Sequence, residues 1–268
     1  MLVIIEALLL ILAALEQDHT ATAVDLIFPL DMAPNSVDDQ YKGCRDKMAN
    51  LVKTKYLEKE MSNLKEFRTA WEKGEKLAKN QADSLTRNNV IAIYVYTDDG
   101  VYRHFNSDTR CDKIKYRQRE YKWYSLHFLL TEAIQVLKKT QKKCFSTFRG
   151  TEIEFNKNVL NTKVRFGSFV SSSLDRKKAS YFGKVSCFEI RTCKGAEVTE
   201  YSKLRHEKEV LIPPYEVFKV TAVRIREDQK DLWCNTVFTL KPSGKKSELD
   251  CALFKKSNKT VAKYNVIH

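Results

Sequence analysis

The chain has 268 residues, of which 43% are hydrophobic and 30% charged; this composition is typical of a globular protein and excludes a wholly disordered chain. With only eight glycines and five prolines, a collagen-like or low-complexity chain is also excluded. Lys and Arg outnumber Asp and Glu by 47 to 34, so the formal net charge is +13. A charge of this sign favours acidic partners such as nucleotides, nucleic acid, glycosaminoglycans or anionic membranes, without choosing among them.

An apolar run opens the chain. Residues 1–15 carry one charged side chain, Glu6, among Leu, Ile and Ala, and the run is too short for a comfortable membrane span. We therefore expect a signal peptide at residues 1–20, cleaved between residues 14 and 23, with a buried N-terminal helix as the alternative. Residues 263–268 form a polar end, which argues against a lipid-anchor signal and favours a freely secreted protein.

Residues 24–268 contain no repeat and no Pro/Gly/Ser-rich linker, so we expect a single domain. Apolar residues three or four apart predict helices over 57–71 and 123–139. Runs rich in β-branched and aromatic residues predict a strand over 90–97 and, later in the chain, strands over 164–169, 185–190, 210–212 and 217–225. Helices first and strands later indicate an α+β fold, and no GxGxxG motif supports a Rossmann domain.

Seven cysteines indicate disulfides if the chain is secreted, and their odd number leaves at least one thiol without an intramolecular partner. Without a CxxC motif or a His near a cysteine pair, we expect no zinc site. Asn258, followed by Lys259 and Thr260, begins the one N-glycosylation sequon.

Three clusters in the second half could carry chemistry. Arg149 next to Gly150 suits phosphate recognition, because the guanidinium is a rigid fork of donors and glycine lets a ligand approach the backbone; most such pairs are ordinary surface turns. Three serines, 171–173, follow a predicted strand and could bind a nucleotide, orient a carboxylate or cap a turn. Glu207 and Glu209 would share one face of an extended segment, although a bare ExE is more often a solvated turn.

In this order, the three clusters resemble the R-S-ExE signature of the vertebrate arginine-specific ecto-mono-ADP-ribosyltransferases. The surrounding segments strengthen the resemblance, which covers roughly residues 25–251: AIYVYTDDGVYRHFN (92–106), SLHFLLTEAIQVL (125–137), CFSTFRG (144–150), VRFGSFVSSSL (164–174) and EVLIPPYEVFKV (209–220). The resemblance implies an α+β ADP-ribosyltransferase fold, with an N-terminal helical part and two antiparallel sheets that form an NAD cleft.

The resemblance also implies roles for individual residues. Arg149 would bind the NAD phosphates, and Gly150 would let the nicotinamide approach the backbone. Ser171 would hold Glu209, which would bond a hydroxyl of the nicotinamide ribose and stabilise the developing cation, while Glu207 would act on the incoming guanidinium. Further candidates for the NAD cleft are Tyr96, Ser168, Phe182 and Ser202. At Ser168 many relatives carry Gln, and at Lys208, between the two acids, many carry a third acid.

The disulfides that the resemblance implies are Cys44–Cys251 and Cys144–Cys193, and the pairing of Cys111, Cys187 and Cys234 stays open. We expect a secreted, monomeric enzyme that transfers ADP-ribose from NAD to arginine side chains of acceptor proteins, with no metal, no nucleic acid and no membrane anchor.

The alternatives are an NAD glycohydrolase, a catalytically weak secreted binding protein with the same fold, and a basic heparin- or nucleic-acid-binding module. The intact Arg149, Ser171 and Glu209 argue against a silent binding protein. The basic module lacks a dense basic run with interleaved aromatics.

Overall fold

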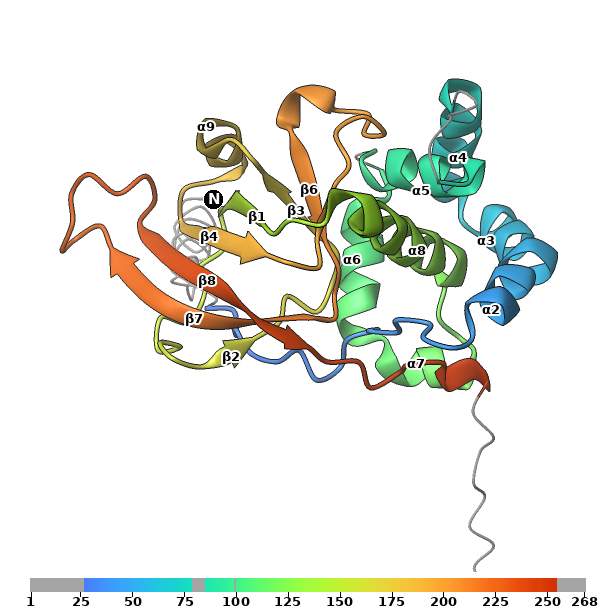
Figure 1. Ribbon diagram of the computed structural model, residues 1–268, viewed down its shortest axis with the longest axis horizontal. Coiled ribbons are helices and arrows are strands. Elements are labelled where there is room, and N and C mark those ends of the chain that lie inside the picture. The colour runs from blue at the N-terminus through green and yellow to red at the C-terminus, as the bar shows by residue number, and fades with distance from the viewer. Residues whose placement is uncertain (1–26, 79–84, 99, 255–268) are drawn as a thin grey trace, which may run out of the picture.

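The computed structural model describes residues 27–78, 85–98 and 100–254. In these residues a helical part comes first and a β-sheet second, and the two lie side by side (Figure 1). This arrangement agrees with the α+β class expected from the sequence. The expected signal peptide at residues 1–20, its cleavage region and the Asn258 sequon lie outside the described residues.

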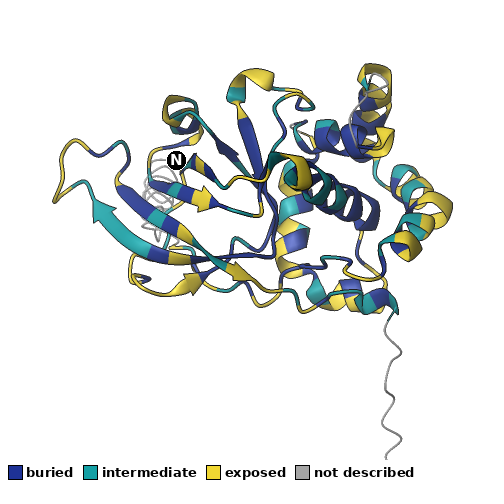
Figure 2. Cartoon of the chain, viewed as in Figure 1, coloured by how far each residue is buried: buried dark blue, intermediate teal, exposed yellow. Residues whose placement is uncertain are grey.

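The helical part is built around α8 (Tyr124–Gln141), whose buried residues include Leu126, Phe128 and Leu130. In Figure 2 this helix is drawn mostly in the colours of buried and intermediate residues. The remaining helices are α2 (Arg45–Leu51), a π-helical stretch (Val52–Tyr56), α3 (Leu57–Asn63), α4 (Lys65–Leu77), α5 (Arg87–Tyr96), α6 (Tyr102–Cys111) and α7 (Lys113–Gln118). The helix expected over 57–71 is divided between α3 and α4, because Leu64 takes an extended conformation (φ −121°, ψ 96°).

The strand expected over 90–97 was wrong, because these residues form most of helix α5. A capping box starts the helix: the Thr86 hydroxyl accepts from the backbone N–H of Asn89, and the Asn89 side chain accepts from the backbone N–H of Thr86. Seven of the ten residues of the helix are buried, in an almost unbroken run from Asn89 to Tyr96, so its apolar residues show no helical periodicity along the sequence. Because the segment is buried and rich in β-branched residues, its sequence is typical of a strand although it folds as a helix.

Eight strands form one sheet in the order β2-β7-β8-β4-β1-β3-β6-β5, rather than two separate sheets. β4 pairs with β8 in parallel and joins two antiparallel groups of strands into one mixed sheet. The strands are β1 (Phe145–Thr151), β2 (Lys163–Val164), β3 (Val170–Ser173), β4 (Ser186–Thr192), β5 (Ala196–Glu197), β6 (Glu209–Ile212), β7 (Glu216–Ile225) and β8 (Thr236–Lys245). A short helix, α9 (Arg176–Ala179), and a 3-10 turn (Ser180–Phe182) connect β3 to β4.

The strand expected over 164–169 is mostly a loop, since only Val164 belongs to β2. The side chain of Arg165 explains the departure: it is buried, pairs with Asp38 at 2.6 Å and donates to the carbonyls of Met32, Ala33 and Lys246. A buried guanidinium needs such a complete set of acceptors. The segment therefore leaves the sheet in order to bind the N- and C-terminal parts of the chain.

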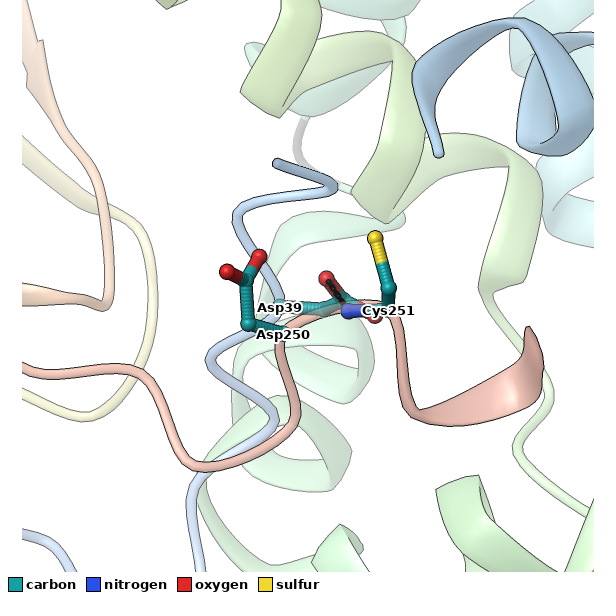
Figure 3. A group of neighbouring side chains, drawn as sticks. All are labelled: Asp39, Asp250 and Cys251. Atoms are coloured by element: carbon teal, nitrogen blue, oxygen red, sulfur yellow. Dashed lines mark hydrogen bonds between the residues drawn. The ribbon is translucent and has the colours of Figure 1, made fainter. Parts of the chain in front are cut away.

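Asp39 joins the same two parts of the chain. Its carboxylate accepts hydrogen bonds from the backbone N–H groups of Tyr41 and Cys251 and from the Tyr116 hydroxyl, at 2.7–2.9 Å. Asp250 and the Cys251 sulfur lie close by (Figure 3). Because these donors already occupy the Asp39 carboxylate and the Cys251 sulfur is in a disulfide, this group serves the structure rather than holding a metal ion.

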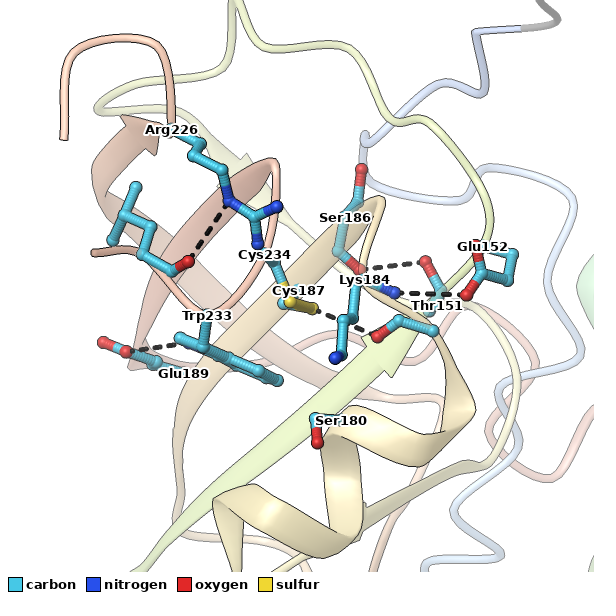
Figure 4. The surroundings of a disulfide bond; sticks show 12 residues. Thr151, Glu152, Ser180, Lys184, Ser186, Cys187, Glu189, Arg226, Trp233 and Cys234 are labelled. Atoms are coloured by element: carbon cyan, nitrogen blue, oxygen red, sulfur yellow. Dashed lines mark hydrogen bonds between the residues drawn. A yellow bond between two sulfur atoms is a disulfide. The ribbon is translucent and has the colours of Figure 1, made fainter. Parts of the chain in front are cut away.

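Three disulfides are formed: Cys44–Cys251, Cys144–Cys193 and Cys187–Cys234. The first two are the pairs implied by the resemblance, and the third settles the question that the sequence left open. Cys187–Cys234 links β4 to the segment before β8, beside Trp233, whose indole N–H donates to Glu189 (Figure 4). Cys111 is a free, exposed thiol. Among the described helices, none is both long enough and apolar enough to cross a membrane.

A buried carboxylate in the helical part predicts a pH-dependent stability. Both oxygens of Glu60 accept a hydrogen bond from the backbone N–H of Ser125 at the start of α8, and burial raises the pKa of Glu60 to about 8. Since this value lies above that of the unfolded chain, the protonated form contributes stability that is complete below about pH 4.5 and lost as the pH rises toward 8. Between pH 5 and 8, the free energy of unfolding of the wild type should therefore fall relative to that of Glu60→Gln, by up to about 1.4 kcal/mol per pH unit.

Urea unfolding with the disulfides intact measures this difference. The control is Glu58→Gln, since Glu58 is exposed on the same helix and its replacement should leave the pH dependence unchanged. Parallel wild-type and Glu60→Gln curves would contradict the prediction.

Candidate active site

A pocket of about 290 Å³ lies where the C-terminal end of α5, helix α6 and strands β1, β3 and β6 come together. Among the residues singled out in the sequence, those that line it are Tyr96, Arg149, Gly150, Ser171, Ser172, Ser173, Phe182, Glu207 and Glu209. All three motif clusters therefore meet in one cavity, although 60 residues separate the first from the last.

Arg149 lies on β1, where it is paired with Phe188 of β4. Its Nη1 donates to the backbone carbonyl of Ser171 at 2.8 Å, which fixes the guanidinium against β3. Burial lowers the pKa of Arg149, because the charged form is separated from water. One of five N–H donors is thus used to hold the side chain, and the cation is presented to the pocket, where it can meet a negatively charged group.

The glycine at position 150 is explained by backbone packing. A Cβ atom added there would lie 2.3 Å from the carbonyl oxygen of Gly183 and 2.5 Å from that of Ala179. Gly183 itself has a φ of +136°, and a Cβ there would lie 2.2 Å from the carbonyl carbon of Thr151. β1 and the turn after α9 are therefore in backbone contact, which is a second reason for glycine beside the approach of a nicotinamide expected from the sequence.

The three serines of β3 hold different partners. The Ser172 hydroxyl donates to the carbonyl of Val210 at 2.9 Å, and the Ser173 hydroxyl donates to that of Glu207 at 2.6 Å. The Ser171 hydroxyl lies 3.4 Å from that of Tyr96. All three serines line the pocket, and Ser172 and Ser173 also fasten the backbone that carries the glutamates. The residue that caps α9 is Asp175 rather than a serine, because the Asp175 carboxylate accepts from the backbone N–H groups of the first turn.

Glu209 is the first residue of β6 and is only 3% exposed. The Ser202 hydroxyl donates to its Oε2 at 3.3 Å, whereas the buried Oε1 has no hydrogen-bond partner within the described part of the chain. A buried acceptor that lacks a partner costs free energy, so its presence in a pocket indicates the place of a ligand donor.

The pKa of Glu209 is raised to about 7 by burial. The nearby Ser171 hydroxyl lowers the pKa of Glu209, and the negative charge of Glu207 raises it. A bound cation would shift the balance back toward the ionised carboxylate, because opposite charges at short range favour the charged form.

Glu207 reaches the pocket in a way that differs from the extended segment expected. It ends a 3-10 turn (Arg205–Glu207), and Lys208 then takes a left-handed conformation with φ 51° and ψ 53°. The chain turns sharply between the two acids, and both still line one cavity. The Lys208 ammonium lies 3.8 Å from Asp175, so this side chain is directed away from the pocket, as expected.

Of the four remaining candidates, two line the pocket and two do not. Tyr96 lines the pocket and donates to the carbonyl of Phe169 at 3.2 Å, and the 55%-exposed ring of Phe182 lies at the rim. Ser202 acts through its bond to Glu209 rather than as a lining residue. Ser168 is buried outside the lining, where its hydroxyl accepts from Arg110 at 3.1 Å, so its expected place in the NAD cleft is not observed.

Two lining residues on α6, Tyr102 and Asn106, were not singled out from the sequence. Asn106 donates to the Tyr96 hydroxyl at 3.2 Å, and its buried Oδ1 has no partner among the described residues. Both residues lie within the segment over 92–106, which is one of the segments that carry the family resemblance. That resemblance is the sequence signal from which they could have been identified.

The fold and site define the class of protein. The crystal structure of the eukaryotic mono-ADP-ribosyltransferase ART2.2 is 30% identical, with a TM-score of 0.72 over 85% of this chain and 100% of that one. A mutant of ART2.2 in complex with NAD matches with a TM-score of 0.70 at the same identity and coverage.

The chain belongs to the NAD:arginine ADP-ribosyltransferase family, whose model matches residues 30–237. Among its relatives, Ecto-ADP-ribosyltransferase 5 of Bos taurus is 36% identical over 207 residues, which are 72% of this chain and 65% of that protein. Ecto-ADP-ribosyltransferase 4 of Pan troglodytes is 33% identical over 94% of this chain and 81% of its own length. NAD(P)(+)--arginine ADP-ribosyltransferase 2 of Gallus gallus is 34% identical over 84% and 73%. The family inferred from the motifs is confirmed.

The backbone contact at Gly150 gives a prediction that needs no ligand. Gly150→Ala should lower the free energy of unfolding by about 1–3 kcal/mol, because a methyl group would push β1 away from the turn at Gly183. Gly100→Ala is the control, since a Cβ at Gly100 would meet only Asp98, at 3.6 Å. Urea unfolding without NAD measures both variants. A Gly150→Ala protein as stable as the wild type would show that the contact does not require glycine.

Proposed function

We propose that this chain transfers ADP-ribose from NAD to arginine side chains of acceptor proteins and releases nicotinamide. The observation that carries the proposal is the buried, unpartnered Oε1 of Glu209 in the cavity that also presents Arg149. Such a cavity offers an acceptor for a sugar hydroxyl and a cation for phosphate oxygens, and NAD carries both groups on the ribose side of the bond that breaks.

Glu209 serves the carbon at which the reaction takes place. The bond between ribose C1′ and the nicotinamide nitrogen breaks, its electron pair neutralises the pyridinium, and the ribose becomes an oxocarbenium-like cation. Because the leaving group is already cationic, no general acid is required. The transition state needs a fixed negative charge nearby, which the ionised Glu209 supplies while Oε1 accepts a ribose hydroxyl.

Glu207 serves the acceptor. A guanidinium is protonated at neutral pH and is a poor nucleophile, so it has to be oriented and to lose a proton as its nitrogen bonds to C1′. A second carboxylate in the same cavity, carried on a separate turn, can accept this proton and leave Glu209 to the sugar.

The other side chains position NAD. Arg149 binds the phosphates, with its guanidinium held by the Ser171 carbonyl. Phe182 offers a ring to the nicotinamide at the rim, and Tyr96 lines the same pocket. Ser171 and Ser202 keep the Glu209 carboxylate in place. We also propose that the enzyme works outside the cell, because three disulfides persist in an oxidising environment.

The test of this function is incubation with NAD labelled in the ADP-ribose part and with agmatine as acceptor. Glu209→Gln keeps the size of the side chain and removes its charge, so both transfer to agmatine and release of free ADP-ribose should fall about 100-fold or more at saturating NAD. Circular dichroism and the unfolding midpoint check that the variant is folded. Near-normal turnover of folded Glu209→Gln would refute the assignment.

A second variant distinguishes transfer to a guanidinium acceptor from hydrolysis by water. Glu207→Gln should lose transfer to agmatine while keeping NAD binding and measurable NAD hydrolysis, because water is small and neutral and needs no carboxylate to orient a cation. Lys208→Ala is the control and should change neither activity much, since Lys208 is directed toward Asp175. Equal losses of transfer and hydrolysis in folded Glu207→Gln would mean that both acids serve the ribose cation.

A further inference from the structure

A second cavity, of about 460 Å³, lies at the junction of the helical part and the sheet. It is formed by the segment before α2, by α8, by the turn after β4 and by the ends of β7 and β8. It shares no lining residue with the pocket that contains Glu209. Its charged lining residues are all cationic: Lys42, Arg45, Lys138, Lys194 and Lys245.

The positive charge of this basic pocket is poorly compensated. Within the described residues, no carboxylate forms an ion pair with the side chain of Lys42, Lys194 or Lys245, all of which are exposed. Arg45 lies 3.8 Å from Glu132, and the buried Glu216 acts on Lys138. Two further acids lie beside the lining, Asp39 and Asp250, and each accepts a backbone N–H there, from Tyr41 and Lys42 respectively.

Glu216 is committed to the backbone. Its carboxylate accepts the Thr192 hydroxyl and the N–H groups of Cys193 and Lys194, at 2.5–3.0 Å. Burial lowers the pKa of the Lys138 ammonium, and the positive charges of Lys194 and Lys143 lower it further. The negative charge of Glu216 raises this pKa but does not outweigh the other effects. The cations repel one another, and this repulsion would be relieved by a bound anion.

The backbone around the pocket is held in place before any ligand arrives. Lys42 and Arg45 flank Cys44, which is bonded to Cys251, and Lys194 follows Cys193, which is bonded to Cys144. Gln135 donates to the carbonyl of Gln40 at 3.1 Å and so ties α8 to the N-terminal segment. A rigid frame reduces the ordering cost of binding, so cations carried on it contribute more affinity than the same cations on a mobile loop.

We propose that this basic pocket binds a segment of sulfated glycosaminoglycan. Several anionic groups on one polymer match several cations around one cavity, and sulfated glycans are polyanions of the oxidising space in which disulfides persist. A single-stranded nucleic acid fits less well, because it is bound by aromatic rings that stack on its bases, whereas the two aromatic lining residues, Tyr41 and Tyr215, are buried.

The sheet provides a matched control surface. Lys163, Lys219 and Lys241 stand directly opposite one another on β2, β7 and β8, all three exposed and without an ion pair among the described residues. Removal of these lysines changes the net charge by the same amount as removal of three lysines from the basic pocket.

The experiment compares two triple variants of the full chain. Binding of a heparin oligosaccharide of defined length is measured by calorimetry at physiological ionic strength, with a hyaluronan oligosaccharide of equal length as the unsulfated comparison. We expect Lys42→Gln/Lys194→Gln/Lys245→Gln to weaken heparin binding about tenfold or more, because three cation contacts and their counterion release are lost. Lys163→Gln/Lys219→Gln/Lys241→Gln should weaken it less than about threefold, and hyaluronan should bind far more weakly than heparin.

The location of binding is tested separately by acetylating lysines in the presence and absence of heparin. Protection of Lys42, Lys194 and Lys245, with no protection of the three sheet lysines, supports the proposal. NAD cleavage by both triple variants should stay within about twofold of the wild type, because neither set lines the NAD pocket. Failure of this last result would bear on the assigned NAD pocket and not on heparin binding.

Four results would overturn the proposal: no heparin binding by the wild type, equal weakening by the two triple variants, displacement of heparin by NAD, or binding to phosphatidylserine vesicles without binding to heparin. The second would show that diffuse net charge is responsible, the third that the NAD pocket is the anion site, and the fourth that the surface recognises membranes.

Discussion

The antiparallel pairing of β3 with β1 on one side and β6 on the other is the constraint on which the active site depends. Ser173 of β3 stands opposite Phe148 of β1 and opposite Glu209 of β6, so these residues lie in one line across three strands. Adjacent strands are about 4.8 Å apart, which places Arg149 and Glu209 at opposite sides of the serine strand and within the length of one nucleotide. A slip of one residue would turn every side chain of a strand to the other face.

That register is itself secured by polar contacts and close packing. The hydroxyls of Ser172 and Ser173 bond to carbonyls of the segment that carries the glutamates, and the Arg149 guanidinium bonds to the carbonyl of Ser171. The close backbone contact at Gly150 then fixes β1 against the turn that presents Phe182. Catalytic and structural requirements therefore coincide in the same few residues, and a buried charge such as Glu209 is tolerated because its neighbours are held rigidly.

The sequence predicted the fold class, the helix of α8, the strands β4, β6 and β7 and the three clusters of the site, because periodicity and residue type can be read from a single sequence. It did not predict β1, β3, β5 or β8. It failed where tertiary contacts decide. α5 is largely buried and has the composition of a strand; the segment after Val164 leaves the sheet because Arg165 has partners elsewhere. Ser168 is engaged by Arg110, a contact that depends on the arrangement of α6 against β3 and has no local signal.

The net charge of +13 sets a problem for an enzyme whose proposed acceptor is a cation. Long-range electrostatics oppose the approach of an arginine-rich acceptor, with a range of about 8 Å at physiological ionic strength. Glu207 acts well within that range and supplies attraction only after the guanidinium has entered the cavity. Sulfate groups held in the basic pocket would neutralise part of the surface charge and leave the NAD pocket open, since the two share no residue. Binding to an anionic polymer would then lower the electrostatic repulsion between the enzyme and a cationic acceptor, which Glu207 alone cannot offset. The two sites would thus be coupled by the electrostatic potential of the protein and not by a conformational change.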